Sequence, residues 1–77
     1  MDNQTLVRMA NQIGYFFEAM PDRDQAMHDI ATHVRKFWDP RMRRQMLEYL
    51  AQHEGEGLTE IVSQAFTRHR GLLEQGS

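Results

Sequence analysis

Apolar residues recur along the chain at alternating steps of three and four, the spacing that places them on one face of an α-helix. The first such run predicts a helix over residues 3–20, whose apolar stripe consists of Leu6, Met9, Ile13, Phe16 and Met20. Gly14 interrupts this helix at a cost of about 1 kcal/mol relative to alanine. It is either a tolerated defect or a position where another part of the backbone comes close.

Start and stop signals divide the rest of the chain into three further helices. Pro21 ends the first helix, and Asp22 followed by Gln25 is typical of an N-terminal capping box. The second helix is predicted to extend to about Phe37, with an inner stripe of Ala26, Ile30, Val34 and Phe37. Asp39 and Pro40 then form the clearest helix start in the chain, an N-cap followed by proline at the first helical position.

The third helix is predicted to run to about Gln52 and to bury Met42, Met46, Leu47 and Leu50. The segment 55–57, Gly-Glu-Gly, is the one flexible link, and a fourth helix follows with a broad apolar stripe from Leu58 to Leu73. Gly71 is a candidate early end of that helix. The pattern therefore predicts an all-α fold, a compact bundle of about four short helices. We expect one domain over residues 1–77, with 71–77 as a candidate flexible tail.

The length of the chain favours a partner. A chain of 77 residues rarely gains more than roughly 3–5 kcal/mol from a single core, and small proteins add disulfides, metals or interfaces. Cysteine is absent, which excludes disulfides and thiolate chemistry. The start of the chain does not resemble a signal peptide, and no apolar run approaches the roughly 18 residues that span a bilayer. We expect a cytoplasmic protein that does not enter membranes.

Candidate chemistry is sparse. His28 and His33 are five residues apart, so they do not share a helix face, and none of the four histidines has a zinc-site spacing. We interpret them as independent residues, two solvated and two packed. Ser63 and Ser77 lie outside any nucleophile motif, and no glycine-rich phosphate loop is present. We therefore expect no catalytic, cofactor-binding or metal-binding residue in this chain.

The junction between the second and third helices is the candidate site. It combines five cations with a tryptophan, and the residues predicted to bind a partner are Arg35, Lys36, Trp38, Arg41, Arg43 and Arg44. The first two suit the end of a helix, where the macrodipole favours cations, whereas the last three occupy a helix start, where acids are preferred. A helix start surrounded by arginines can hold carboxylates or phosphates, and tryptophan is frequent at interface hot spots.

Three other interpretations stay open. Trp38 could fill the small core while the arginines pair with Glu48 and other acids. Two helices joined by a short turn also describe a helix-turn-helix DNA reader, but the net charge of −2 argues against nucleic acid as a partner. A free-standing homodimeric adaptor is the third, since an exposed docking surface can pair with itself.

Several segments resemble one family. The residues 8–13 (Arg-Met-Ala-Asn-Gln-Ile), the Phe16-Phe17 pair, the block 33–43 around Phe-Trp-Asp-Pro-Arg-Met-Arg and the step 55–58 are similar to the delta subunit of soluble NAD-dependent formate dehydrogenases. The resemblance covers about Leu6 to Phe66, and the tail from Arg68 carries no matching motif.

This resemblance implies a non-catalytic accessory subunit that binds no cofactor itself. Its partner would be the catalytic alpha subunit and, through it, the beta and gamma subunits. That complex would carry bis-(molybdopterin guanine dinucleotide) molybdenum or tungsten, iron–sulfur clusters and FMN. The implied role is to assist assembly, stability or cofactor insertion, either as a permanent subunit or as a transient maturation factor.

Overall fold

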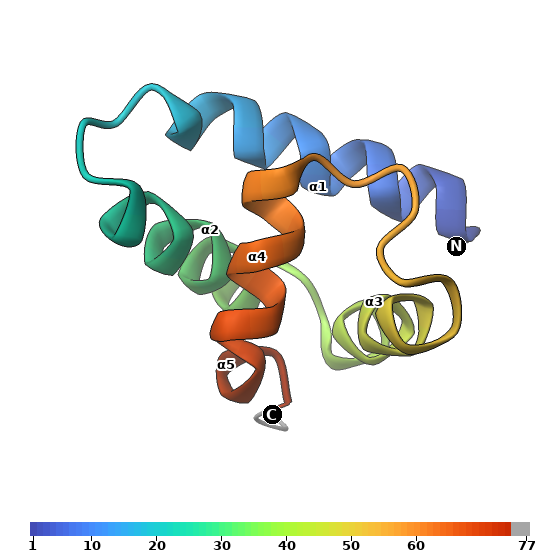
Figure 1. Cartoon of the computed structure of the whole chain (residues 1–77). Coiled ribbons are helices and arrows are strands. Elements are labelled where there is room, and N and C mark those ends of the chain that lie inside the picture. The colour runs from blue at the N-terminus through green and yellow to red at the C-terminus, as the bar shows by residue number, and fades with distance from the viewer. Residues whose placement is uncertain (75–77) are drawn as a thin grey trace.

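The computed structural model describes residues 1–74, which form five α-helices (Figure 1). These are α1 (Asn3–Glu18), α2 (Arg23–Phe37), α3 (Pro40–His53), α4 (Glu60–Arg68) and α5 (Arg70–Glu74). α1 packs against α2, α3 and α4, while α5 contacts both α2 and α3. In Figure 1, α4 runs downward from beneath α1 and passes in front of α2, and α3 lies to the side beneath the start of α1. The all-α bundle predicted from the hydrophobic pattern is confirmed.

Aspartate side chains fix the starts of the first three helices. The backbone N–H groups of Gln25 and Met42 donate to Asp22 and Asp39, at 3.2 Å and 3.0 Å, so both predicted caps are present. Asp2 caps α1 in the same way by accepting from the Thr5 N–H at 2.8 Å. That backbone hydrogen bond lowers the pKa of the Asp2 carboxyl, because it favours the charged form.

The predicted fourth helix is shorter and divided. α4 begins at Glu60, after a turn in which Gly55 and Gly57 adopt positive φ angles of 74° and 87°. It ends at Arg68, because the φ of −109° and ψ of 36° at the next residue, His69, leave the helical region. Gly71 therefore lies inside α5 and does not end α4. Residues 71–74 of the predicted flexible tail are helical, with Leu73 buried, and 75–77 lie outside the described residues.

The core is assembled from apolar side chains of all five helices. The largest fully buried side chains are Leu6, Ile30, Val34, Met46, Val62, Phe66 and Leu73. On α1 the buried face is formed by Leu6, Ala10 and Gly14, so the predicted stripe was displaced around the helix. Phe16 and Phe37, both assigned to the interior from the pattern, are 77% and 71% exposed. Small residues give little hydrophobic signal, which is why the pattern missed the true inner face of α1.

Gly14 marks a close approach between α1 and α4. A Cβ atom at this position would lie 2.4 Å from Cγ2 of Val62. One helical turn earlier, the Asn11 side chain donates to the Gly57 carbonyl and accepts from the Thr59 N–H, both at 2.9 Å. Gly14 is therefore not a tolerated defect, and the group that comes close to it is the Val62 side chain and not another backbone.

Candidate functional site

The structure places the six predicted partner-binding residues at different depths. Lys36, Arg41 and Arg44 are exposed, and Arg35 is half-buried in the last turn of α2. Trp38 and Arg43, by contrast, are only 5% and 2% exposed. Trp38 thus belongs to the core, as the alternative interpretation held. The six residues do not form one continuous surface.

The two exposed arginines of α3 differ in their surroundings. Arg44 lines a hollow between α3 and α5 together with Glu48 and Arg70. Arg41 lies at the start of α3, next to Met42, which lines a groove on another side of the molecule. Lys36 and Arg41 are therefore the exposed cations that directly precede groove-lining residues in the sequence, namely Phe37 and Met42. Arg44 belongs to a separate part of the surface.

Most of the residues that line that groove are apolar or aromatic. It has a volume of about 540 Å³ and lies between α1, the end of α2 and the start of α3. Its lining is formed by Met9, Gln12, Ile13, Phe16, Phe17, His33, Phe37, Trp38 and Met42. We call it the aromatic groove.

A row of rings runs along this groove from α1 to α2. The ring centroids of Phe16 and Phe17 are 5.0 Å apart at right angles, and those of Phe17 and His33 are 6.2 Å apart. His33 and Phe37 continue the row at 4.6 Å. Lys36 lines a smaller hollow with Phe17, His33 and Phe37, so a cation borders the aromatic row.

Sequence reasoning missed the groove because it assigned Phe16 and Phe37 to the core. The available signal was the width of the apolar face of α1. Apolar residues at 6, 9, 10, 13, 16 and 17 cover more of the helix circumference than one buried face requires. The surplus lines the aromatic groove.

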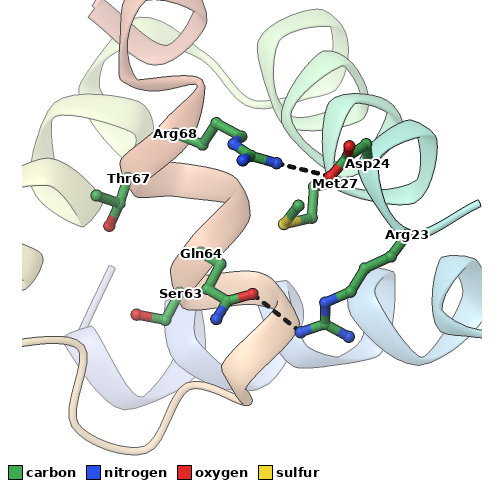
Figure 2. Close-up of a pocket in the computed structure, with 7 residues that line it drawn as sticks. All are labelled: Arg23, Asp24, Met27, Ser63, Gln64, Thr67 and Arg68. Carbon is green, nitrogen blue, oxygen red and sulfur yellow. Dashed lines mark hydrogen bonds and ion pairs between the residues drawn. The ribbon is translucent and has the colours of Figure 1, made fainter.

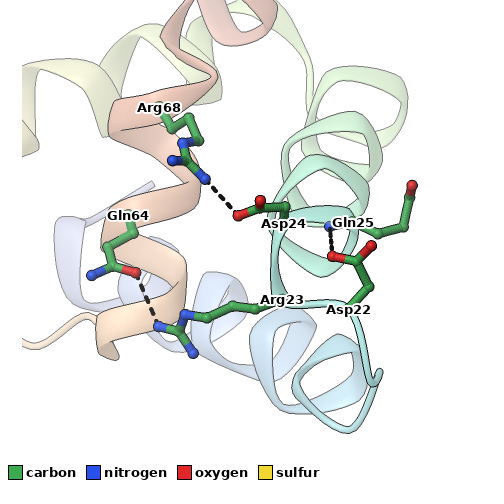
Figure 3. A network of polar contacts seen from close by, with 6 residues as sticks. All are labelled: Asp22, Arg23, Asp24, Gln25, Gln64 and Arg68. Carbon is green, nitrogen blue, oxygen red and sulfur yellow. Dashed lines mark hydrogen bonds and ion pairs between the residues drawn. The ribbon is translucent and has the colours of Figure 1, made fainter.

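A second hollow, of about 590 Å³, lies between α2 and α4 (Figure 2). Its charged residues have partners (Figure 3): Arg68 Nη1 lies 2.7 Å from Asp24 Oδ1, and Arg23 Nη2 donates to the neutral Gln64 Oε1 at 3.0 Å. An exposed ion pair such as Arg68–Asp24 contributes about 0–1 kcal/mol. We interpret these contacts as polar interactions that hold α4 against α2.

The prediction of four independent histidines is wrong for one pair. The rings of His28 and His69 are 5.3 Å apart and nearly perpendicular. Burial, and then the neighbouring His28, lowers the pKa of His69. Within residues 1–74, no three His, Cys, Asp or Glu side chains gather in a way that could hold a metal ion. No described helix is both long and apolar enough to cross a membrane.

Comparison with known protein families relates the chain to a characterised family. Residues 5–66 match the model of the NADH-dependent formate dehydrogenase delta subunit FdsD. The chain belongs to this family. The match spans most of α1, all of α2 and α3 and most of α4, and it includes the whole lining of the aromatic groove. No curated protein and no solved structure matches the chain.

Family membership makes the chain a formate dehydrogenase delta subunit, so it belongs to a complex with other subunits of that enzyme. It confirms the resemblance and favours a subunit over a DNA-binding regulator. The structure agrees, because the burial of Arg43 removes one of the three arginines that would have faced a phosphate backbone. α5 lies beyond the matched range.

Proposed function

We propose that this chain is a non-catalytic accessory subunit that docks on the catalytic alpha subunit of formate dehydrogenase. In this role it assists assembly, stability or insertion of the molybdenum cofactor. The cofactor, the iron–sulfur clusters and FMN would be held by the partner subunits. Family membership supports the assignment of the chain to formate dehydrogenase. The exposed side chains at the α2–α3 junction support a role in docking.

The observation that carries the proposal is the combination of exposed aromatic rings on the aromatic groove and exposed cations at the α2–α3 junction, whose Phe37, Trp38 and Met42 line part of that groove. Phe16 and Phe37 present most of their surface to solvent, and Lys36 and Arg41 follow at the end of α2 and the start of α3. Contiguous apolar patches on small proteins mark interaction sites. Aromatic residues and arginine are also the types enriched in interfaces.

The position of Arg41 adds an electrostatic argument. Arg41 is exposed in the first turn of α3, where the positive end of the helix dipole disfavours cations. Carboxylates on the alpha subunit would offset this unfavourable arrangement in the complex. Complementary charge of this kind increases association rate and specificity.

The proposal is tested by expressing the enzyme subunits with and without this chain. We expect the yield of assembled enzyme, its formate-dependent NAD reduction and the metal content of the alpha subunit to fall when the chain is absent. A metal-free alpha subunit would indicate a role in insertion. A metal-loaded alpha subunit lacking its partners would indicate a role in assembly.

Charge reversal adds a matched comparison. Lys36→Glu together with Arg41→Glu should weaken copurification with the alpha subunit about tenfold or more, equivalent to about 1.4 kcal/mol. Arg8→Glu is the control, because Arg8 is exposed on α1 in a different hollow, beside Tyr49 and Glu56. Full activity and full metal content without the chain would contradict the proposed function.

A further inference from the structure

The ring contact between His28 and His69 joins α2 to the point where α4 passes into α5. The two ring centroids are 5.3 Å apart, and the ring planes are nearly perpendicular, at 83°. His69 directly follows α4, and its carbonyl accepts the Leu72 N–H of α5 at 3.0 Å. The half-buried side chain of His69 therefore lies where three helices meet.

α5 is anchored by one buried side chain. It consists of five residues, of which Leu73 alone is buried, and Leu72 packs partly against the core. Its ion pair, Arg70 Nε to Glu74 Oε2 at 2.7 Å, lies within the helix and does not reach a neighbour. A helix this short does not persist in water without packing. The position of α5 below α4 (Figure 1) therefore depends on the two leucines and on the junction at His69.

Two acids of α2 lie near the ring pair. Asp29 is on the side of His28, with its Oδ1 3.7 Å from His28 Nδ1. Asp24 favours a proton on His69, but its carboxylate already lies 2.7 Å from Arg68 Nη1 (Figure 3). Protonation of both rings would therefore place two positive charges about 5 Å apart, with one of the two nearby carboxylates already in an ion pair.

The residues next to His69 in the chain are also cations. Arg68 precedes it at the end of α4, and Arg70 follows it at the start of α5. From the other side, α3 contributes Arg44 and Glu48 to the hollow that Arg70 lines. These three helices therefore supply no surplus of negative charge that would stabilise a protonated His69.

Opposing effects act on a proton at His69. The C-terminal end of α4 favours a cation through the helix dipole. Burial disfavours the charged ring, and His28 and Arg68 add to this effect, so the pKa of His69 lies below its ordinary value. The folded junction therefore prefers the neutral ring, and a protonated His69 is more stable in water.

We propose that His28 and His69 form an acid-sensitive contact that holds α5 in place: with neutral rings α5 stays packed on α2 and α3, and protonation of His69 releases it. The opening is local, because α1 is attached to the start of α4 by contacts that do not involve α5, among them those of Asn11 with Gly57 and Thr59. This inference does not rest on the proposed function, and α5 lies beyond the residues that match the family.

A single thiol measures the release of α5. The chain has no cysteine, so a Leu73→Cys variant carries one thiol, at a position that is 2% exposed. Its reaction rate with 4,4′-dithiodipyridine, divided by the rate in the unfolded chain at the same pH, gives the open fraction. We expect this fraction to rise about three- to tenfold between pH 7 and 5.5, because a histidine released to water contributes at most about a factor of ten per pH unit below about 6.5. An open fraction that does not change with pH would overturn the proposal.

Two histidine variants identify the group that takes up the proton. In the Leu73→Cys background, His69→Gln should reduce the rise to less than about twofold. His53→Gln is the matched control, because the His53 ring lies on α3 against Tyr49, with 4.9 Å between the ring centroids. This control should keep the full rise. A full rise in the His69→Gln variant would show that another group controls α5.

Val62→Cys distinguishes release of α5 from unfolding of the whole protein. Val62 is fully buried on α4, and its thiol should react at least about tenfold more slowly than that of Leu73→Cys. Equal protection of the two thiols would contradict a local opening. Should Leu73→Cys fail to fold, hydrogen exchange of the Leu72 amide in the wild-type chain, measured by NMR, reports on the same opening. Protection of that amide that is independent of pH would refute the proposal.

Discussion

Two residues of α1 determine how closely α4 can approach. Gly14 leaves room for the Val62 side chain, and Asn11 binds the backbone on both sides of the turn that leads into α4. The side-chain amide of Asn11 thus provides hydrogen-bond partners for the Gly57 carbonyl and the Thr59 N–H. The start of α4 is held in place by one side chain from the first helix.

Gly14→Ala is expected to destabilise the protein. The added Cβ would lie 2.4 Å from Val62 Cγ2, and the branched valine cannot move away freely. Overpacking of this kind costs about 1–3 kcal/mol, more than the roughly 1 kcal/mol that alanine gains over glycine in a helix. Urea unfolding of wild type and variant measures the difference.

Gly71→Ala is the matched control. A Cβ on Gly71 meets nothing within 4 Å, so the change should leave stability unchanged or raise it by up to about 1 kcal/mol. Val62→Ala in the Gly14→Ala background should remove the clash. Equal stability of the two glycine variants would show that α1 and α4 are not in close contact at Gly14.

At the scale of helices, the sequence predicted element positions better than element orientation. The caps at Asp22 and Asp39 carry specific hydrogen-bonding chemistry and could be recognised in the sequence. The inner face of α1 could not, because two of its three buried residues, Ala10 and Gly14, are small. The division between α4 and α5 was missed because Leu72 and Leu73 continue the apolar spacing of α4 across His69.

The α4–α5 junction should make stability depend on pH. Burial and the nearby His28 lower the pKa of His69, while Asp24 acts in the opposite direction and Arg68 reinforces the lowering. The unfolded chain therefore binds a proton more readily than the folded one. The contribution of neutral His69 to the free energy of unfolding is fully present above a pH of about 6.5, and it is lost as the pH falls through the pKa of His69 in the folded protein.

Thermal unfolding measured from pH 7.5 down to 5 examines this dependence. His69→Gln should reduce the loss of stability across that window, because it removes the group that takes up the proton. Identical pH profiles for the variant and wild type would show that His69 does not contribute.

At the scale of the whole molecule, the aromatic residues fall into two groups with different roles. Phe66 is fully buried in the core, whereas Phe16 and Phe37 are on the wall of the aromatic groove. Phe66→Ala should cost about 3–5 kcal/mol, as much as the roughly 3–5 kcal/mol that a core of this size supplies. We expect that variant to be largely unfolded.

Phe16→Ser and Phe37→Ser should each change the free energy of unfolding by only about 0.5 kcal/mol or less, as exposed substitutions do. Denaturant midpoints of the three variants test this division. A loss of several kcal/mol for either exposed phenylalanine would place that ring in the core.

The candidate site shows the same division between what the sequence could and could not predict. The cluster of cations was visible, and Lys36, Arg41 and Arg44 are exposed. The burial of Arg43 was also readable, because it lies three and four residues before Met46 and Leu47, on the buried face of α3. The groove itself depends on how α1, α2 and α3 meet, which no local pattern specifies.

Trp38 gives the protein an intrinsic optical probe. It is the single tryptophan of the chain, it is 5% exposed, and it lines the aromatic groove. Its emission therefore reports on the polarity of the groove without any label. A ligand that excludes water would shift that emission to shorter wavelength, and loss of the fold would shift it to longer wavelength. Docking and denaturation can thus be distinguished by the direction in which the fluorescence maximum of Trp38 shifts.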